Sequence, residues 1–339
     1  MTSRDTLTES FIAASPWAGA TRALLAGDAS NRRYERLSLN GKTAVLMDAP
    51  HDKGEDVRPF IRIARYLTDL GLSAPLILAE DQENGFLLLE DLGDDLFARV
   101  IPREPELEQP LYAAATDMLI QLHRAAPPDD LPAYDTNVML NMAALAWRWY
   151  LGGALAEYAD AEQAFRAAFR PVLEDHAAET SVLIQRDYHA ENLLWLPDRK
   201  GAARVGLLDF QDAMAGHPAY DLVSVLQDAR RDVPLPIEEA MITRYVTATG
   251  LDESAFRAAY AVLGVQRNLR ILGVFGRLCL VNGKPHYVDL IPRVWGLLLR
   301  DLEHPALAPV RDLVIGSLPA PNPEILKGLK DKCATIPKP

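Results

Sequence analysis

Three polar side chains, Asp187, Asn192 and Asp209, stand beside short apolar runs that are typical of strands. Phosphoryl transfer from ATP needs a carboxylate that receives or orients the proton of the acceptor hydroxyl, and oxygen ligands that hold magnesium against the phosphates. A loop that presents Asp187 and Asn192, together with a strand end that presents Asp209, could supply both. The flanking apolar runs are Val182–Ile184, Leu193–Leu196 and Val205–Leu208.

The spacing of these residues matches a known pattern. A single Asp or Asn in a loop is usually a turn or cap residue. The run from Arg186 to Asn192, however, has the form R-D-x-x-x-x-N, and Asp209 follows a later apolar run, as in the protein-kinase catalytic loop and metal aspartate. The segment Pro218–Leu222, P-A-Y-D-L, distinguishes the chain from ordinary protein kinases. With these motifs the chain resembles the aminoglycoside phosphotransferase/choline kinase-like superfamily.

This resemblance implies a protein-kinase-like fold and the phosphorylation of a small molecule with ATP and Mg²⁺. It also implies that Asp187 is the catalytic base and that Asn192 and Asp209 are magnesium ligands. Asp221 is expected to brace the catalytic loop, and Arg186 to have a structural role.

A loop suited to phosphates precedes these motifs. Leu24–Tyr34 stands where the family has its phosphate-covering loop, and its small residues permit close approach of the backbone to phosphates. Glu90-Asp91-Leu92 falls at the expected hinge, where backbone groups would meet the adenine. The residues expected to bind the nucleotide are Gly27, Ala29, Ser30, Asn31, Arg32, Glu90 and Leu92.

The strand after this loop departs from the family pattern. Kinases present a lysine there to the phosphates and pair it with a glutamate of the next helix. Here Met47 stands at the lysine position, and the next helix offers only arginines. Either another basic residue, such as Lys42, Arg32 or Arg33, serves the phosphates, or the chain is a non-catalytic pseudokinase. The intact Asp187 and its partner residues favour activity.

Three further segments resemble one particular group within this superfamily. The loop G-D-A-S-N-R-R-Y, the strand V-L-M-D-A-P and the helix Gln266–Gly273 resemble the bacterial anomeric sugar kinases of cell-wall recycling. These phosphorylate N-acetylmuramic acid and N-acetylglucosamine at the anomeric hydroxyl. The lactyl carboxylate of the first sugar would favour an arginine. Arg267 and Arg270, which lie one helical turn apart, are candidates, alongside Arg32 and Arg33. His189 and Glu191 complete the residues expected to bind the acceptor, although arginines of an acidic protein more often pair with acids.

Other functions stay open on the sequence alone. Aminoglycoside, choline, homoserine and methylthioribose acceptors suit the same fold. A metal-dependent hydrolase could use His189, Glu191, Asp209 and Asp212, but paired histidines at metal-ligand spacing are missing from the sequence. In a kinase, Asp212 would either assist a second metal or cap a turn.

The elements that must position these residues change in character along the chain. Short strands and one helix dominate residues 1–92, with hairpins at Asn40-Gly41 and at Glu80–Asn84. Helical patterns dominate residues 93–339. We therefore predict an α+β, bilobal fold, with a small β-rich N-lobe and a large helical C-lobe that meet at a ligand-binding cleft. The long predicted helices are Pro110–Ala126, Thr136–Tyr158, Glu162–Ala178, Pro236–Thr249, Glu253–Asn282 and Tyr287–Leu302.

Composition limits the classes of partner. The chain has 339 residues, a formal net charge of -12 and 49% hydrophobic residues. An acidic surface repels phosphate backbones and anionic membranes, so no nucleic-acid or membrane partner is expected. Cys279 and Cys333, the two cysteines, lack metal-type spacing, and no apolar stretch is long enough for a membrane span. A reduced, cytoplasmic protein with an amino sugar and Mg-ATP as partners is predicted.

Overall fold

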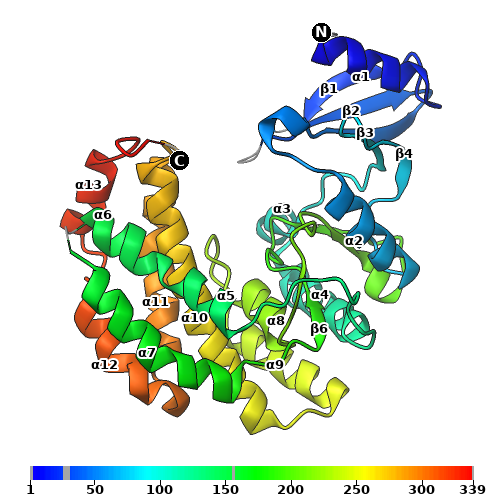
Figure 1. Ribbon diagram of the computed structural model, residues 1–339. Coiled ribbons are helices and arrows are strands. Elements are labelled where there is room, and N and C mark those ends of the chain that lie inside the picture. Colours follow the sequence, from blue (N-terminus) through cyan, green and yellow to red (C-terminus); the bar gives the residue numbers. More distant parts are fainter. Residues whose placement is uncertain (1–2, 26–30, 155–156, 338–339) are drawn as a thin grey trace. The chain divides into compact units, whose positions relative to one another are not determined.

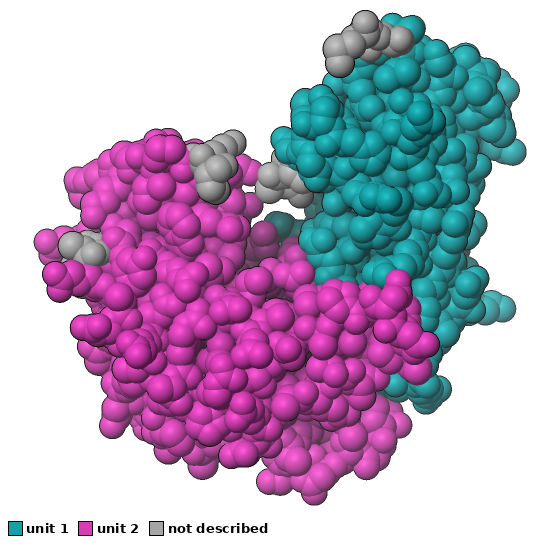
Figure 2. Space-filling model, viewed as in Figure 1, with its two compact units in different colours: residues 1–125, 190–213 teal, residues 126–189, 214–339 magenta. Residues whose placement is uncertain are grey.

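The computed structural model describes residues 3–25, 31–154 and 157–337. They form two compact units, which Figure 2 shows in different colours. The first comprises residues 1–125 and 190–213, and the second comprises residues 126–189 and 214–339. The predicted lobe division at residue 92 does not coincide with these boundaries and stays a prediction.

An antiparallel sheet organises the first unit, with the strand order β1-β2-β3-β5-β4. Both predicted hairpins are present. Asn40 and Gly41 have φ of 52° and 75°, which is the left-handed geometry that a tight two-residue hairpin turn requires. The strands are β1 (Thr21–Leu25), β2 (Arg33–Leu39), β3 (Lys42–Asp48), β4 (Ile77–Asp81) and β5 (Phe86–Glu90).

A helix that the sequence analysis did not predict packs on this sheet. Helix α1 (Arg4–Ala13) lies beside the strands of the sheet (Figure 1). Its residue Ile12 belongs to a buried cluster with Leu37, Leu46, Phe86 and Leu88. Apolar residues alternate along the strands, so the residues that face α1 lie on one side of the sheet.

The remaining elements of the first unit are helices and a small strand pair. The ladder of β7 (Leu193–Trp195) and β8 (Val205–Leu207) is antiparallel, with Leu193 opposite Leu207. Strand β8 therefore ends two residues before Asp209, earlier than predicted. The helices are α2 (Arg58–Asp69), α3 (Phe97–Arg103) and α4 (Glu108–Leu122), with the 3-10 turns η1 (His51–Lys53), η2 (Pro105–Leu107) and η4 (Gly201–Arg204).

Helix α10 (Glu253–Leu280) is the central element of the second unit (Figure 1). It has 28 residues, and it is buried along most of its length by neighbouring helices. The short antiparallel pair of β6 (Val182–Ile184) and β9 (Met214–Gly216) lies in the same unit. The other elements are α5 (Thr136–Ala143), α6 (Gly152–Ala154), α7 (Ala159–His176), α8 (Ala219–Leu226), α9 (Leu235–Thr249), η5 (Pro285–Leu290), α11 (Ile291–Leu302), η6 (Pro305–Leu307), α12 (Ala308–Ser317) and α13 (Pro323–Asp331).

The prediction of a single α-helix over Thr136–Tyr158 is wrong. Helix α5 is followed by the π-helix η3 (Ala146–Leu151) before α6 begins. This segment packs very closely on α10, because a Cβ on Gly273 would lie 2.2 Å from the carbonyl carbon of Leu145. The aromatic residues Trp147 and Tyr150 of η3 are fully buried.

Across the described ranges 3–25, 31–154 and 157–337, no helix combines the length and the apolar character that crossing a bilayer requires.

The close packing at Gly273 gives a stability prediction. Gly273→Ala forces a methyl group into the η3 backbone and should lower the free energy of unfolding by about 1–3 kcal/mol. Gly296→Ala in α11 is the matched control, because no atom lies within 4 Å of its added Cβ. This control should gain about 0.5–1 kcal/mol from helix propensity. Urea denaturation measures both, and equal shifts of the two variants would contradict the packing argument.

Candidate active site

Asn192 and Asp209 lie at the same end of the β7/β8 ladder. Asn192 directly precedes β7 and Asp209 follows β8, and the two strands are antiparallel. The N–H of Leu208 donates to the carbonyl oxygen of Asn192 at 3.0 Å, which holds the two segments together. An amide oxygen and a carboxylate at one strand-pair end are oxygen ligands of the type that Mg²⁺ takes, so these residues fit a magnesium site.

The segment at Asp209 is anchored in the core of the first unit. Asp209 has φ of 58°, and its carboxylate oxygen Oδ1 accepts from Nε2 of Gln211 at 2.7 Å. The next residue, Phe210, is fully buried, and its ring centre lies 4.8 Å from that of Phe60 on α2. The exposed carboxylate of Asp209 is therefore carried by a short segment that core packing fixes.

Asp187 lies in the second unit beside an arginine of α10. Nη2 of Arg270 is 3.7 Å from Oδ1 of Asp187. Burial raises the pKa of Asp187, but the charges of Arg270 and of neighbouring arginines outweigh this, so its pKa lies below the ordinary value. Asp187 is therefore an anion at neutral pH and can accept a hydrogen bond from a hydroxyl.

Asp221 contacts the backbone just before Asp187. It is fully buried at the start of α8. Its Oδ2 accepts from the N–H of Gln185 at 2.6 Å, and its Oδ1 accepts from the N–H of Arg186 at 3.0 Å. Burial raises the pKa of Asp221 to about 7, while the two N–H groups act in the opposite direction. Arg186 has φ of 72°, an uncommon backbone conformation that these bonds help to hold.

The residues predicted to bind the acceptor differ in exposure. Arg267 is only 3% exposed, and its Nη1 donates to the carbonyl oxygen of Gln227 at 3.1 Å. His189 is buried, with Nε2 3.4 Å from Nη1 of Arg230, and burial lowers its pKa to about 4. Its imidazole is therefore neutral at physiological pH. Glu191 is exposed.

Part of the predicted nucleotide loop can be located. Gly27, Ala29 and Ser30 lie outside the described residues. Asn31 and Arg32 are described, and both bind Glu55. The sequence pattern did not indicate Glu55, because the family has its glutamate inside the following helix. Glu55 instead lies three residues before α2 begins.

The predicted hinge residues have partners within the first unit. The carboxylate of Glu90 pairs with Nη2 of Arg199 at 2.5 Å, and its N–H donates to the carbonyl oxygen of Leu76 at 2.8 Å. Leu92 is buried. The sequence analysis also missed Arg36 on β2, whose Nε is 2.7 Å from Oδ2 of Asp91. This ion pair ties the segment after β5 to the sheet, and the residues are too far apart in sequence for spacing to reveal it.

The residues considered for a metal-dependent hydrolase do not form a metal-binding cluster in the part of the chain that the structure describes. Among the residues that the structure describes, no three His, Cys, Asp or Glu side chains group as a metal site. Asp212, which that cluster included, is exposed two residues after Phe210.

Comparison with known proteins gives consistent matches. The family described as "Phosphotransferase enzyme family" matches residues 21–260. The N-acetylmuramate/N-acetylglucosamine kinase of Caulobacter vibrioides is 38% identical, over 91% of this chain and 95% of that protein. The protein of the same name from Pseudomonas putida is 34% identical, over 85% of both chains.

Solved structures agree on the fold. Choline kinase LicA from Streptococcus pneumoniae has a TM-score of 0.63 at 13% identity, and the match covers 87% of this chain and 99% of that one. The gentamicin complex of the aminoglycoside phosphotransferase APH(2")-IIa has a TM-score of 0.59 at 12% identity, covering 91% and 99%. The predicted α+β, protein-kinase-like fold is confirmed.

The two Asp221 bonds give a prediction for the second unit. In Asp221→Asn, one carboxylate oxygen becomes an amide N–H₂ that faces a backbone N–H, so one buried donor loses its acceptor. We expect a loss of about 1–3 kcal/mol in the free energy of unfolding, and faster amide hydrogen exchange at Gln185 and Arg186. Ser224→Ala is the control, since it removes only a 3.3 Å bond to the carbonyl oxygen of Arg186. Unchanged exchange in Asp221→Asn would contradict the bracing role.

Proposed function

The chain belongs to the phosphotransferase enzyme family and is a kinase, and from that premise we propose that it transfers a phosphoryl group from ATP to the anomeric hydroxyl of N-acetylmuramic acid and N-acetylglucosamine. The products are sugar 1-phosphates for peptidoglycan recycling. The observation that carries this proposal is the match to four N-acetylmuramate/N-acetylglucosamine kinases at 32–38% identity, over 85–91% of the chain.

In this proposal Asp187 is the catalytic base. Its low pKa keeps it ionised, and the anion can orient the anomeric hydroxyl and accept its proton. An anomeric hydroxyl is more acidic than an ordinary alcohol, so a single carboxylate is enough. Asp221 and Arg186 act through the backbone that precedes Asp187.

Asn192 and Asp209 are proposed to hold Mg²⁺ through their side-chain oxygens. When bound, this ion neutralises charge on the phosphates of ATP. The backbone hydrogen bond from Leu208 to Asn192 supports this assignment, because it holds the two segments together within the first unit.

The remaining site residues are assigned to substrates. Arg270 is the stronger candidate for the lactyl carboxylate, because Arg267 is almost fully buried and already donates to Gln227. His189 and Glu191 are proposed to contact the sugar. For the nucleotide we propose Asn31 and Arg32, the backbone around Glu90 and Leu92, and the loop residues Gly27, Ala29 and Ser30.

Support for ATP comes from two fold neighbours with bound nucleotide, LicA in complex with AMP and the aminoglycoside phosphotransferase APH(2'')-Ib bound to ADP. We place the reaction in the cytoplasm, where ATP is available and where Cys279 and Cys333, both free thiols, stay reduced.

A panel of acceptors with Mg-ATP tests the proposal. Phosphorus NMR should show a 1-phosphate with N-acetylmuramic acid and with N-acetylglucosamine, and no product with choline or an aminoglycoside. Asp187→Asn should lower kcat by at least about two orders of magnitude. A 6-phosphate would refute the anomeric assignment. No ATP turnover with any sugar would favour the pseudokinase alternative that Met47 suggests.

The contact between Arg270 and Asp187 predicts a pH effect. Arg270→Gln removes the positive charge that most strongly opposes the effect of burial on Asp187. The pKa of Asp187 should therefore rise, so that the base becomes protonated at a higher pH. The acid limb of the kcat/KM profile should therefore move up by about one pH unit or more. Arg277→Gln is the control, because Arg277 is an exposed arginine on the same helix. Coincident profiles for the two variants would contradict this account.

A further inference from the structure

Strand β3 carries no cation where a kinase has its phosphate-binding lysine. Met47 occupies that position and is 1% exposed, so it is a core residue. Tyr34 of β2 is its cross-strand partner. If the chain binds ATP as proposed, a cation near this pair has to come from another part of the first unit.

Arg32 lies two residues before Tyr34 and forms a partly buried ion pair. Its Nε donates to Oε2 of Glu55 at 2.8 Å, and the two side chains are 14% and 12% exposed. The other carboxylate oxygen, Oε1, accepts from the N–H of Asn31 at 3.0 Å, and the side chain of Asn31 donates to the carbonyl oxygen of Lys53. Glu55 is therefore bound to both residues that precede β2.

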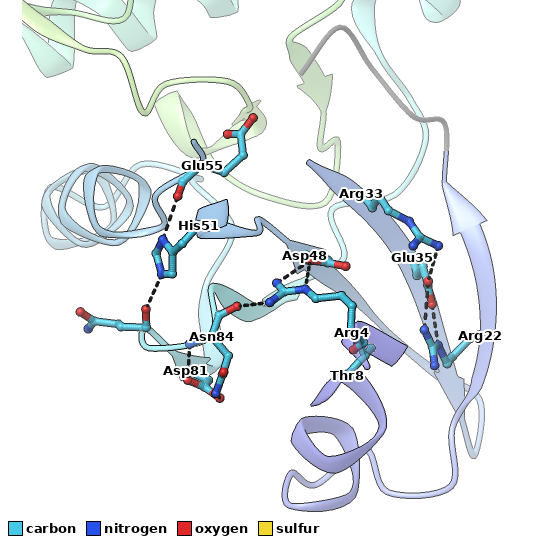
Figure 3. A network of polar contacts seen from close by, with 11 residues as sticks. Arg4, Thr8, Arg22, Arg33, Glu35, Asp48, His51, Glu55, Asp81 and Asn84 are labelled. Atoms are coloured by element: carbon cyan, nitrogen blue, oxygen red, sulfur yellow. Dashed lines mark hydrogen bonds and ion pairs between the residues drawn. The ribbon is translucent and has the colours of Figure 1, made fainter. Parts of the chain in front are cut away.

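The backbone at Glu55 is fixed to the sheet by a histidine. Nδ1 of His51 lies 2.8 Å from the carbonyl oxygen of Glu55, and its Nε2 lies 2.9 Å from that of Gln82, in the turn between β4 and β5 (Figure 3). Burial of Arg32 against a carboxylate held in this way restricts the guanidinium to one place, which is the function of the glutamate in the usual lysine–glutamate pair.

Tyr34 interacts both with Arg32 and with the proposed metal ligand Asp209. Arg32 hydrogen-bonds the hydroxyl of Tyr34, and the charge of Asp209 acts on the same hydroxyl. Tyr34, Arg32 and Asp209 all belong to the first unit. The Tyr34 hydroxyl is thus subject both to Arg32 and to Asp209, the residue that is proposed to hold magnesium against the phosphates.

The two other basic candidates fit less well. Arg33 is directed to Glu35, which it shares with Arg22 (Figure 3). Its side chain is 54% exposed. Lys42 begins β3 opposite Leu39 and is five residues from Met47.

We propose that the Arg32–Glu55 ion pair replaces the lysine–glutamate pair of other kinases, with Arg32 as the residue that contacts the ATP phosphates and Glu55 as its positioning residue. This inference rests on the proposed function. A guanidinium carries five N–H donors, so the bond from Nε to Glu55 is compatible with contacts to phosphate oxygens, for which its planar shape is suited.

The affinities of the full chain for ATP, ADP and AMP test this role. These nucleotides differ only in their number of phosphates, so a residue that contacts the phosphates should affect them unequally. Calorimetry with ATP, ADP and AMP should show that Arg32→Ala weakens ATP and ADP binding about tenfold or more, but AMP binding less than about threefold. Arg32→Lys should recover part of the loss. Arg22→Ala is the matched control, because it also removes an arginine–glutamate pair from this sheet, and it should leave all three affinities unchanged.

The positioning role of Glu55 has its own readout. Glu55→Gln should raise the KM for ATP about three- to tenfold while the KM for the sugar stays constant. Circular dichroism and the melting temperature identify variants that fail to fold. Equal losses for ATP and AMP, or no loss in Arg32→Ala, would overturn this inference while wild-type activity stands. Failure of the wild type to bind ATP would overturn the proposed function itself.

Discussion

The bond between the buried Asp221 carboxylate and two backbone N–H groups determines how the second unit presents its reactive side chain. Removing a carboxylate from water costs several kcal/mol unless donors match its oxygens, and here each oxygen receives one N–H. The same bonds hold Arg186 at positive φ, a conformation that costs about 1–2 kcal/mol in a non-glycine residue. Because Asp187 is the next residue, its direction is fixed before any substrate arrives.

Local charge in this region is opposite to that of the whole chain. The formal net charge is -12, yet Asp187 is surrounded by Arg186, Arg267 and Arg270. This arrangement keeps the carboxylate ionised despite burial, and it also offers a favourable field to acceptors that carry a carboxylate. The net charge of the chain therefore says little about the sign of the charge at an individual site.

The sequence was sufficient where the determining interactions are local. The hairpin at Asn40-Gly41 follows from two residues that adopt positive φ, and the strands around the R-D-x-x-x-x-N loop follow from short apolar runs. The close packing of the π-helix could not be predicted, because it involves glycines of α10 more than 120 positions later in the chain. Contacts such as Arg36 with Asp91, or the thiol of Cys333 with the carbonyl oxygen of Cys279, likewise join distant residues. The roles of the site residues follow from the motif, and their bonds follow only from the fold.

The apolar residue Met47 on β3 is consistent with the proposal that Arg32 supplies the phosphate-binding cation. Met47 lies opposite Tyr34, and Tyr34 hydrogen-bonds Arg32. Arginine keeps its charge when half-buried, whereas a lysine in such surroundings readily loses its proton. With Arg32 as the proposed cation for the phosphates, position 47 on β3 needs no charge. The buried Met47 instead adds to the core of the sheet.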